Sequence, residues 1–121
     1  ALLYAALLKD LDRVLCIVPP GEAEATHFAD DLKALGLTAA VFPPRDFMLR
    51  PVEGAGREYE YRRLSVLGAL AGGRLQAVCV PAEALLQYTV PRAEFIQNTI
   101  TITPGMVNTS DALVARLRAA G

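Results

Sequence analysis

The chain has 121 residues, of which 53 % are hydrophobic and 21 % charged, and its net charge is −1. That charge balance excludes a strongly basic nucleic-acid-binding domain. Membrane spans need roughly 20 consecutive apolar residues, which this sequence lacks. Its first residues also lack the basic start and cleavage site of a signal peptide. We therefore expect a soluble cytoplasmic protein, with no membrane partner.

The mean hydropathy of +0.31 is high for a self-contained domain of this size. We therefore expect part of the apolar surface to need a partner. The chain opens with the apolar helical pattern ALLYAALL and has no initiating Met, which favours a piece of a longer polypeptide. Cys16 and Cys79 each lie in a β-branched apolar run, so we expect two reduced core thiols in preference to a disulfide.

The first predicted unit is a strand, a turn and a helix. The apolar run at 14–18 predicts a strand buried on both faces, and Pro19-Pro20-Gly21 ends it. From Glu22 onward, apolar residues recur at helical spacing and Gly36 follows as a C′ residue. The expected buried positions are Ala25, Phe28, Ala29, Leu32 and Leu35.

The next elements repeat this alternation. Residues 38–42 predict a second strand, the loop at 45–56 leads to a helix that begins near Arg57, and Gly72-Gly73 ends that helix. Residues 75–80 predict a third strand, and Pro81 opens a short helix that reaches Tyr88. The expected inward-facing residues of these two helices are Leu64, Leu67, Ala71, Leu85 and Leu86.

The pattern changes after Pro91. The alternation TITIT at 99–103 predicts a strand with one wet face, and Asn108-x-x-Asp111 predicts a capping box before a helix with Leu113, Val114 and Leu117. We therefore place a boundary near 92–97, with one domain over 1–92 and the start of another over 93–121.

Strands that alternate with helices predict an α/β fold, with a layered, mostly parallel sheet and flanking helices. Three strands are few for such a sheet. We expect strands of the parent protein to complete it, or open sheet edges of two copies to pair.

The sequence contains no recognisable catalytic motif. A phosphate-binding loop would follow the first strand as GxxxxGK[ST], but here two prolines remove amide donors and Glu22 repels phosphate. His27 is predicted to be a surface residue, and Asp30-Asp31 a solvated pair. Glu22 and Glu24 favour helix capping. We predict no catalytic residue, no metal site and no cofactor, so this chain is not expected to be an enzyme.

The best candidate for binding is the segment REYEYRR at 57–63, because arginine and tyrosine suit both protein interfaces and stacked bases. An exposed helix stabilised by its own ion pairs is the simpler interpretation. The candidate binding residues are Arg57, Tyr59, Arg62 and Arg63. DNA binding through the three arginines is a weaker hypothesis. The apolar triplet Phe47-Met48-Leu49 either fills a neighbouring groove or marks a contact surface.

The residues FPPRDFMLRPVEGAGREYEYRRLSVLGAL, followed by VCVPAEALLQYTVP, resemble the N-terminal UvrB-homology module of bacterial transcription-repair coupling factors. In that family a strand ending in FP leads to a loop, a helix with an R-L pair and a V-P-x-x-x-L-L-Q motif, matched here by Pro81, Leu85, Leu86 and Gln87. The resemblance covers essentially the whole chain, with NTITITPGMVNTSDALVARLRAAG as the opening of the next subdomain.

The resemblance implies a degenerate P-loop NTPase-like module that acts in transcription-coupled nucleotide excision repair. It would help to recruit UvrA and restrain a downstream ATP-dependent DNA translocase. RNA polymerase and DNA would contact downstream domains, and the UvrA contacts are expected beyond Gly121. UvrB itself shares the ancestry, but the 42–57 connection is too short for its hairpin insertion.

Two alternatives remain open. The chain could belong to a UvrB-type, helicase-like ATPase whose phosphate loop lies upstream of Ala1. It could also be an unrelated ligand-binding or response-regulator-like domain. Acidic residues at the strand carboxyl ends would favour this second alternative. The predicted strands instead end in Val18-Pro19, Phe42-Pro43 and Val80-Pro81.

Overall fold

A computed structural model describes residues 1–11, 13–45, 58–104 and 110–119. It divides into two compact units, Ala1–Thr89 and Val90–Gly121, where the sequence suggested 1–92 and 93–121. The first unit is a small α/β fold whose three-stranded parallel sheet is flanked by helices. Within the described ranges, none of the helices is long and apolar enough to cross a membrane.

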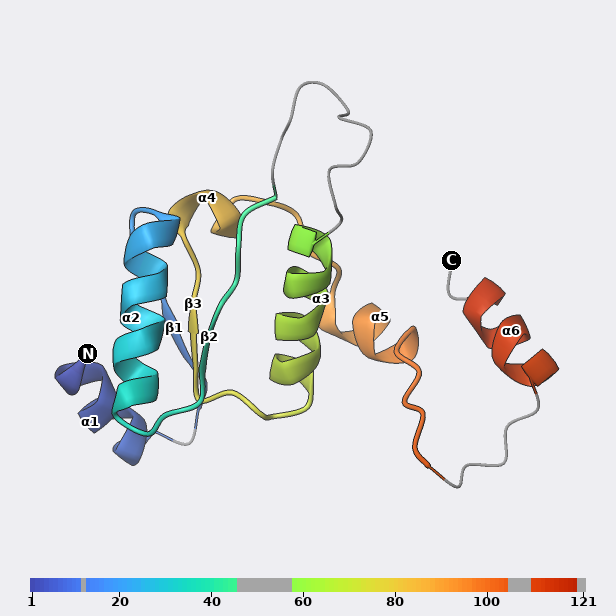
Figure 1. Cartoon of the computed structure of the whole chain (residues 1–121), viewed down its shortest axis with the longest axis horizontal. Coiled ribbons are helices and arrows are strands. Elements are labelled where there is room, and N and C mark those ends of the chain that lie inside the picture. Colours follow the sequence, from blue (N-terminus) through green and yellow to red (C-terminus); the bar gives the residue numbers. More distant parts are fainter. Residues whose placement is uncertain (12, 46–57, 105–109, 120–121) are drawn as a thin grey trace. The chain divides into compact units, whose positions relative to one another are not determined.

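The sheet consists of β1 (Leu15–Ile17), β2 (Ala39–Val41) and β3 (Ala77–Cys79), in the order β1-β3-β2. Cys16 is level with Val78 on one side of β3, and Ala40 is level with Val78 on the other. The first crossover passes β3 and the second returns to it, so right-handed connections place their helices on opposite faces. Figure 1 shows α2 (Glu22–Ala34) and α3 (Glu58–Ala71) on either side of the strands.

The face of the sheet toward α2 is closed by small side chains. Ala25, Ala29 and Leu32 of α2 have no exposed surface, and neither do Ala77 and Cys79 of β3. The prediction of α2 is confirmed, including its end, because Gly36 adopts φ +81°, which glycine reaches without strain. The prediction that Leu35 is buried is wrong, because 44 % of its surface is exposed. Helix α1 (Leu2–Asp10) adds Leu8 to this core, and Tyr4 packs edge-on against Phe28.

The face toward α3 is built from larger side chains and is less complete. Phe42, Val66, Val78, Val80 and Ala84 form its core. The expectation that β1 is buried on both faces is wrong: Ile17 is buried toward α2, but Val14 and Val18 are 44 % and 48 % exposed. The α3 side of β1 is therefore only partly covered, although Leu67 and Leu70 of α3 line a groove together with Cys16.

The buried face of α3 differs from the predicted one. Leu64 is 51 % exposed, whereas Arg63 and Val66 are buried, with Leu67 and Leu70 packed beside them. These four positions follow the spacing i, i+3, i+4 and i+7 of a helix face. The prediction failed because it assumed that Arg63 belongs to the solvated face.

Helix α4 (Ala82–Leu85) follows β3 directly, with Pro81 as its N-cap. The prediction that Leu85 and Leu86 point inward is wrong, because they are 56 % and 88 % exposed. Ala84 takes the buried position instead, at 1 % exposure. The helix is only one turn long, so a single side chain reaches the sheet.

The second unit contains α5 (Arg92–Gln97) and α6 (Ser110–Ala119). The strand expected at 99–103 is absent: this segment has no regular structure, and no described strand pairs with it. Alternation alone does not hold a strand without a partner. Helix α6 confirms the predicted helix, although Val114 and Leu117 are exposed. Asn108 of the expected capping box lies outside the described residues.

Candidate functional site

The most unusual side chain of the first unit is Arg63, which is buried in the core on the α3 face with 4 % of its surface exposed. Its Nη1 donates hydrogen bonds to the carbonyl oxygen of Pro43 at 2.7 Å and to Oε1 of Gln87 at 3.1 Å. The guanidinium also lies over the ring of Phe42, 4.1 Å from its centroid, a favourable cation–π contact. Arg63 therefore links α3 to the segment that follows β2.

Gln87 extends this link to the next residues of the chain. Its Oε1 accepts a hydrogen bond from the backbone N–H of Arg45 at 2.7 Å, and its Nε2 donates to the carbonyl oxygen of Arg45 at 3.4 Å. One side-chain amide thus satisfies both backbone groups of Arg45, as a neighbouring strand would. We call Arg63, Gln87 and the backbone of Pro43 and Arg45 the Arg63–Gln87 cluster.

Among the residues that the structure describes, the salt bridges leave the buried charge of Arg63 without an acidic partner. Nη2 of Arg63 is buried and has no hydrogen-bond partner among the described residues. Burial, and then the charge of Arg45, lower the pKa of Arg63. Because a guanidinium stays protonated in proteins, the cost appears as a less favourable folded state, offset by the contacts of Nη1 and the Phe42 ring.

A cleft of about 860 Å³ opens beside this cluster, at the carboxyl ends of the strands. In open parallel sheets this edge is where ligands bind. The cleft receives residues from the start of α2, the segment after β2, the start of α3 and the segment after β3. Its lining residues are Glu22, Pro44, Arg45, Tyr59, Glu83, Leu86, Gln87 and Tyr88.

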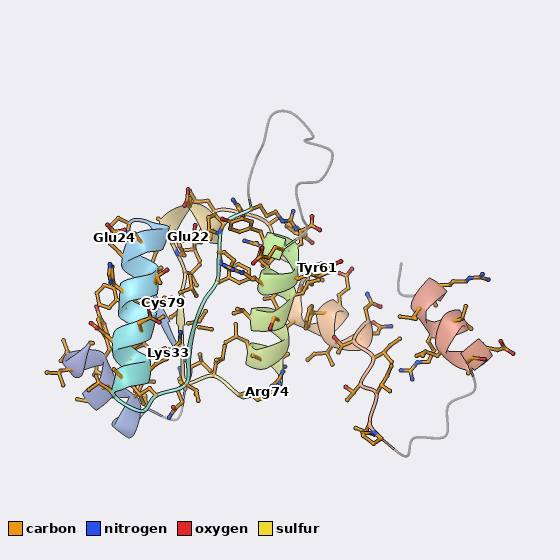
Figure 2. All side chains as sticks on the ribbon, in the orientation of Figure 1. Glu22, Glu24, Lys33, Tyr61, Arg74 and Cys79 are labelled. Atoms are coloured by element: carbon orange, nitrogen blue, oxygen red, sulfur yellow. The ribbon has the colours of Figure 1, made fainter. Side chains whose placement is uncertain are left out.

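The side chains of this cleft are better suited to binding the surface of another protein than to binding a phosphate. Leu86 and Tyr88 are 88 % and 74 % exposed, and tyrosine and arginine are enriched at protein interfaces. At the amino end of α2, where a phosphate would bind, an oxygen of Glu24 lies 2.9 Å from the point where a Cβ of Gly21 would stand. Figure 2 shows Glu22 and Glu24 together at this end of α2.

The structure describes three of the four predicted binding residues, and it does not bring these three together on one surface. Tyr59 lines the cleft. Arg62 is exposed and pairs with Glu58 at 2.7 Å, whereas Arg63 is buried, and Arg57 lies outside the described residues together with Phe47, Met48 and Leu49. A binding role for the four residues stays a prediction. Because Arg63 is buried, it could influence binding only indirectly, by holding Gln87 and Pro43 in place.

The sequence did not indicate a role for Arg45. It also did not indicate that Gln87 connects Arg63 to the backbone of Arg45. The available signal was a polar residue directly after Leu85-Leu86, at a point where the sequence predicted a helix packed on the sheet. His27 is exposed as expected. In the described ranges, His, Cys, Asp and Glu side chains form no group of three or more that could hold a metal ion.

The two cysteines lie on opposite faces of the sheet. Cys79 is buried on the α2 face, as expected, and Cys16 is exposed on the α3 face, which corrects the prediction of a core residue. Both are free thiols. Burial raises the pKa of both, and for Cys79 the proximity of Cys16 raises it further while Lys33 lowers it. Neither thiol is therefore activated as a nucleophile.

Comparison with models of protein families, with curated proteins and with solved structures found no match.

Proposed function

We propose that this chain is a non-catalytic interaction module of the kind found at the N-terminus of bacterial transcription-repair coupling factors. Its fold would be a degenerate relative of P-loop NTPases. In the parent protein it would help to recruit UvrA and to restrain the downstream DNA translocase, in the bacterial cytoplasm. The restraint would require contact with the rest of the parent chain, and RNA polymerase and DNA would be held by downstream domains.

The observation that carries this proposal is the pair of exposed side chains Leu86 and Tyr88 at the mouth of the strand-end cleft. An apolar side chain that is 88 % exposed beside a cleft of this size fits a surface that another protein covers. Both residues belong to the segment VCVPAEALLQYTVP, which also carries the family resemblance.

The turn between β1 and α2 supports a module that does not hydrolyse nucleotides. Pro19 is buried, and its carbonyl oxygen accepts a hydrogen bond from the N–H of Ala82 at 3.1 Å. Proline offers no amide proton to a phosphate. The carboxylate of Glu24 already occupies the amino end of α2, so a phosphate there would meet a like charge.

Binding to purified UvrA tests the recruitment role. We expect a longer version of the chain, extended through the following subdomain, to bind UvrA at least about tenfold more tightly than residues 1–121, a difference of roughly 1.4 kcal/mol. Equal absence of binding by both versions would contradict the proposal. Calorimetric titration with ATP is the second measurement, and clear nucleotide binding by residues 1–121 would favour the helicase-like alternative.

The restraint role depends on the cleft and has its own test. In the full parent protein, Leu86→Ser should raise the basal rate of ATP hydrolysis by about fivefold or more, the lower range of allosteric coupling. Leu2→Ser is the matched control, since Leu2 is also exposed, at 75 %, but lies on α1. An equal effect of both substitutions, or no effect of either, would remove the cleft from the restraint.

A further inference from the structure

Strand β1 lies at an edge of the three-stranded sheet and pairs with β3 along one side. The N–H of Leu15 donates to Gln76, and the carbonyl oxygen of Ile17 accepts from Val80, so both residues turn their backbone toward β3. Backbone groups alternate in direction along a strand. Val14, Cys16 and Val18 therefore direct their N–H and C=O groups away from the sheet.

The same three residues place their side chains on the α3 side, which is only partly covered. Val14 and Val18 are 44 % and 48 % exposed, and Cys16 is exposed as well. Cys16 also lines an apolar groove of about 220 Å³, together with Leu67, Leu70 and Leu85. Unpaired backbone and exposed apolar side chains thus coincide on one short segment, a template for an additional strand.

The opposite edge of the sheet does not share these properties. On β2, Ala39 is only 8 % exposed, and Val41 packs against the core on the α2 face. On its other face Ala40 packs against the core below α3. Both faces of β2 are thus covered by helices, and strand pairing there would bury little additional apolar surface.

We propose that β1 pairs antiparallel with β1 of a second copy of this chain, centred on Cys16. The sequence of the segment supports a self-complementary contact, because residues 14–18 read Val-Leu-Cys-Ile-Val. A twofold axis at Cys16 brings Val14 opposite Val18 of the second copy and Leu15 opposite Ile17. Isologous interfaces require this kind of self-complementary surface.

The backbone of Cys16 points away from the sheet. Cys16 and Cys16 of the second copy therefore form the central hydrogen-bonded pair of the new ladder. In such a pair the two Cα atoms are about 5.5 Å apart and the side chains lie on the same face. Arg13, the next charge along the strand, falls opposite Pro19 of the second copy, so no like charges meet. The result is a six-stranded sheet in which the six side chains of Val14, Cys16 and Val18 form one apolar row.

Sedimentation over a concentration series tests the pairing. The native chain should form dimers, and Val18→Lys should weaken the association at least about tenfold, because an edge lysine disfavours strand pairing. Leu64→Lys is the matched control: Leu64 is 51 % exposed, close to the 48 % of Val18, but lies on α3. Circular dichroism checks that both variants fold.

The native thiols give a direct measure of register. In a Cys79→Ser chain, oxidation should link two copies through Cys16, since about 5.5 Å lies within the Cα separation that disulfides span. In a Cys16→Ser chain, oxidation should leave monomers. Cross-linking through Cys79 instead, or equal weakening by the two lysine variants, would overturn the proposal. A chain that stays monomeric would also overturn it and would favour a strand of another polypeptide as the occupant of this edge.

Discussion

The two faces of the sheet are covered by helices of similar length, yet they differ in how completely they are closed. Toward α2, small residues meet small residues: Ala25 and Ala29 face Ala77 and Cys79, and all four have no exposed surface. Small side chains allow the helix and the sheet to approach closely, which leaves no space for a polar group. This face is a self-sufficient core.

Toward α3, the packing is held by a mixture of apolar and polar contacts. Phe42 and Val80 are 6 % and 7 % exposed, but the guanidinium of Arg63 lies among them, and the part of this face over β1 is open. The strand-end cleft and the groove beside Cys16 both include residues of this side. The comparison indicates that stability depends mainly on the α2 face, whereas the α3 face is available for binding.

Truncation of the α2 face should give the largest loss of stability. Leu32→Ala removes the largest side chain of α2 that has no exposed surface, and burial of this kind contributes about 2–5 kcal/mol to the free energy of unfolding. Leu35→Ala is the matched control from the same helix end, where the side chain is 44 % exposed, and it should cost less than half as much. Urea denaturation measures both. Equal costs would show that the α2 face is not the dominant core.

The polar contacts of the α3 face should contribute less to the free energy of unfolding than the α2 core does. Two substitutions of Arg63 separate the contribution of its polar head from that of its apolar stem. Arg63→Ala removes the hydrogen bonds to Pro43 and Gln87 together with the contact on Phe42, and we expect a loss of about 2 kcal/mol. Arg63→Met keeps the apolar stem, so we expect about half that loss. A methionine variant more stable than the native chain would show that burial of the charge outweighs its hydrogen bonds.

The sequence predicted the parts of the fold that follow from local periodicity. The apolar spacing from Ala25 to Leu32 defined α2, and Gly36 marked its end. The short β-branched runs located all three described strands. Periodicity also indicated α3, but not which side of it is buried, because Arg63 counts as a surface residue in any apolar pattern. Only the contacts with Phe42, Pro43 and Gln87, brought close by the fold, explain its burial.

The failures at Leu86, Cys16 and residues 99–103 have a common physical cause. Each prediction assumed that an apolar segment finds a partner. Leu86 follows a helix too short to bury it, Cys16 is exposed on an edge strand, and no described strand pairs with 99–103. The cleft was likewise beyond sequence reasoning, since its lining comes from four separate segments of the chain.

The smallest expected effect concerns the outer surfaces of α2 and α3, where the two sides of the molecule should behave alike. Arg62 and Glu58 form an exposed i,i+4 ion pair on α3, and Lys33 and Asp30 form an exposed i,i+3 pair on α2. Water screens both pairs, so double-mutant cycles with alanine should give coupling energies of about 0.3–0.5 kcal/mol in each helix. Both couplings should decrease further in high salt.

Similar couplings would mean that the difference between the two faces arises where the helices contact the sheet, through small residues below α2 and a buried guanidinium below α3. A coupling on α3 that exceeds about 1 kcal/mol and resists salt would contradict this view. It would place the Glu58–Arg62 pair in a less solvated environment than its exposed side chains indicate, and α3 would then be stabilised partly from its outer side.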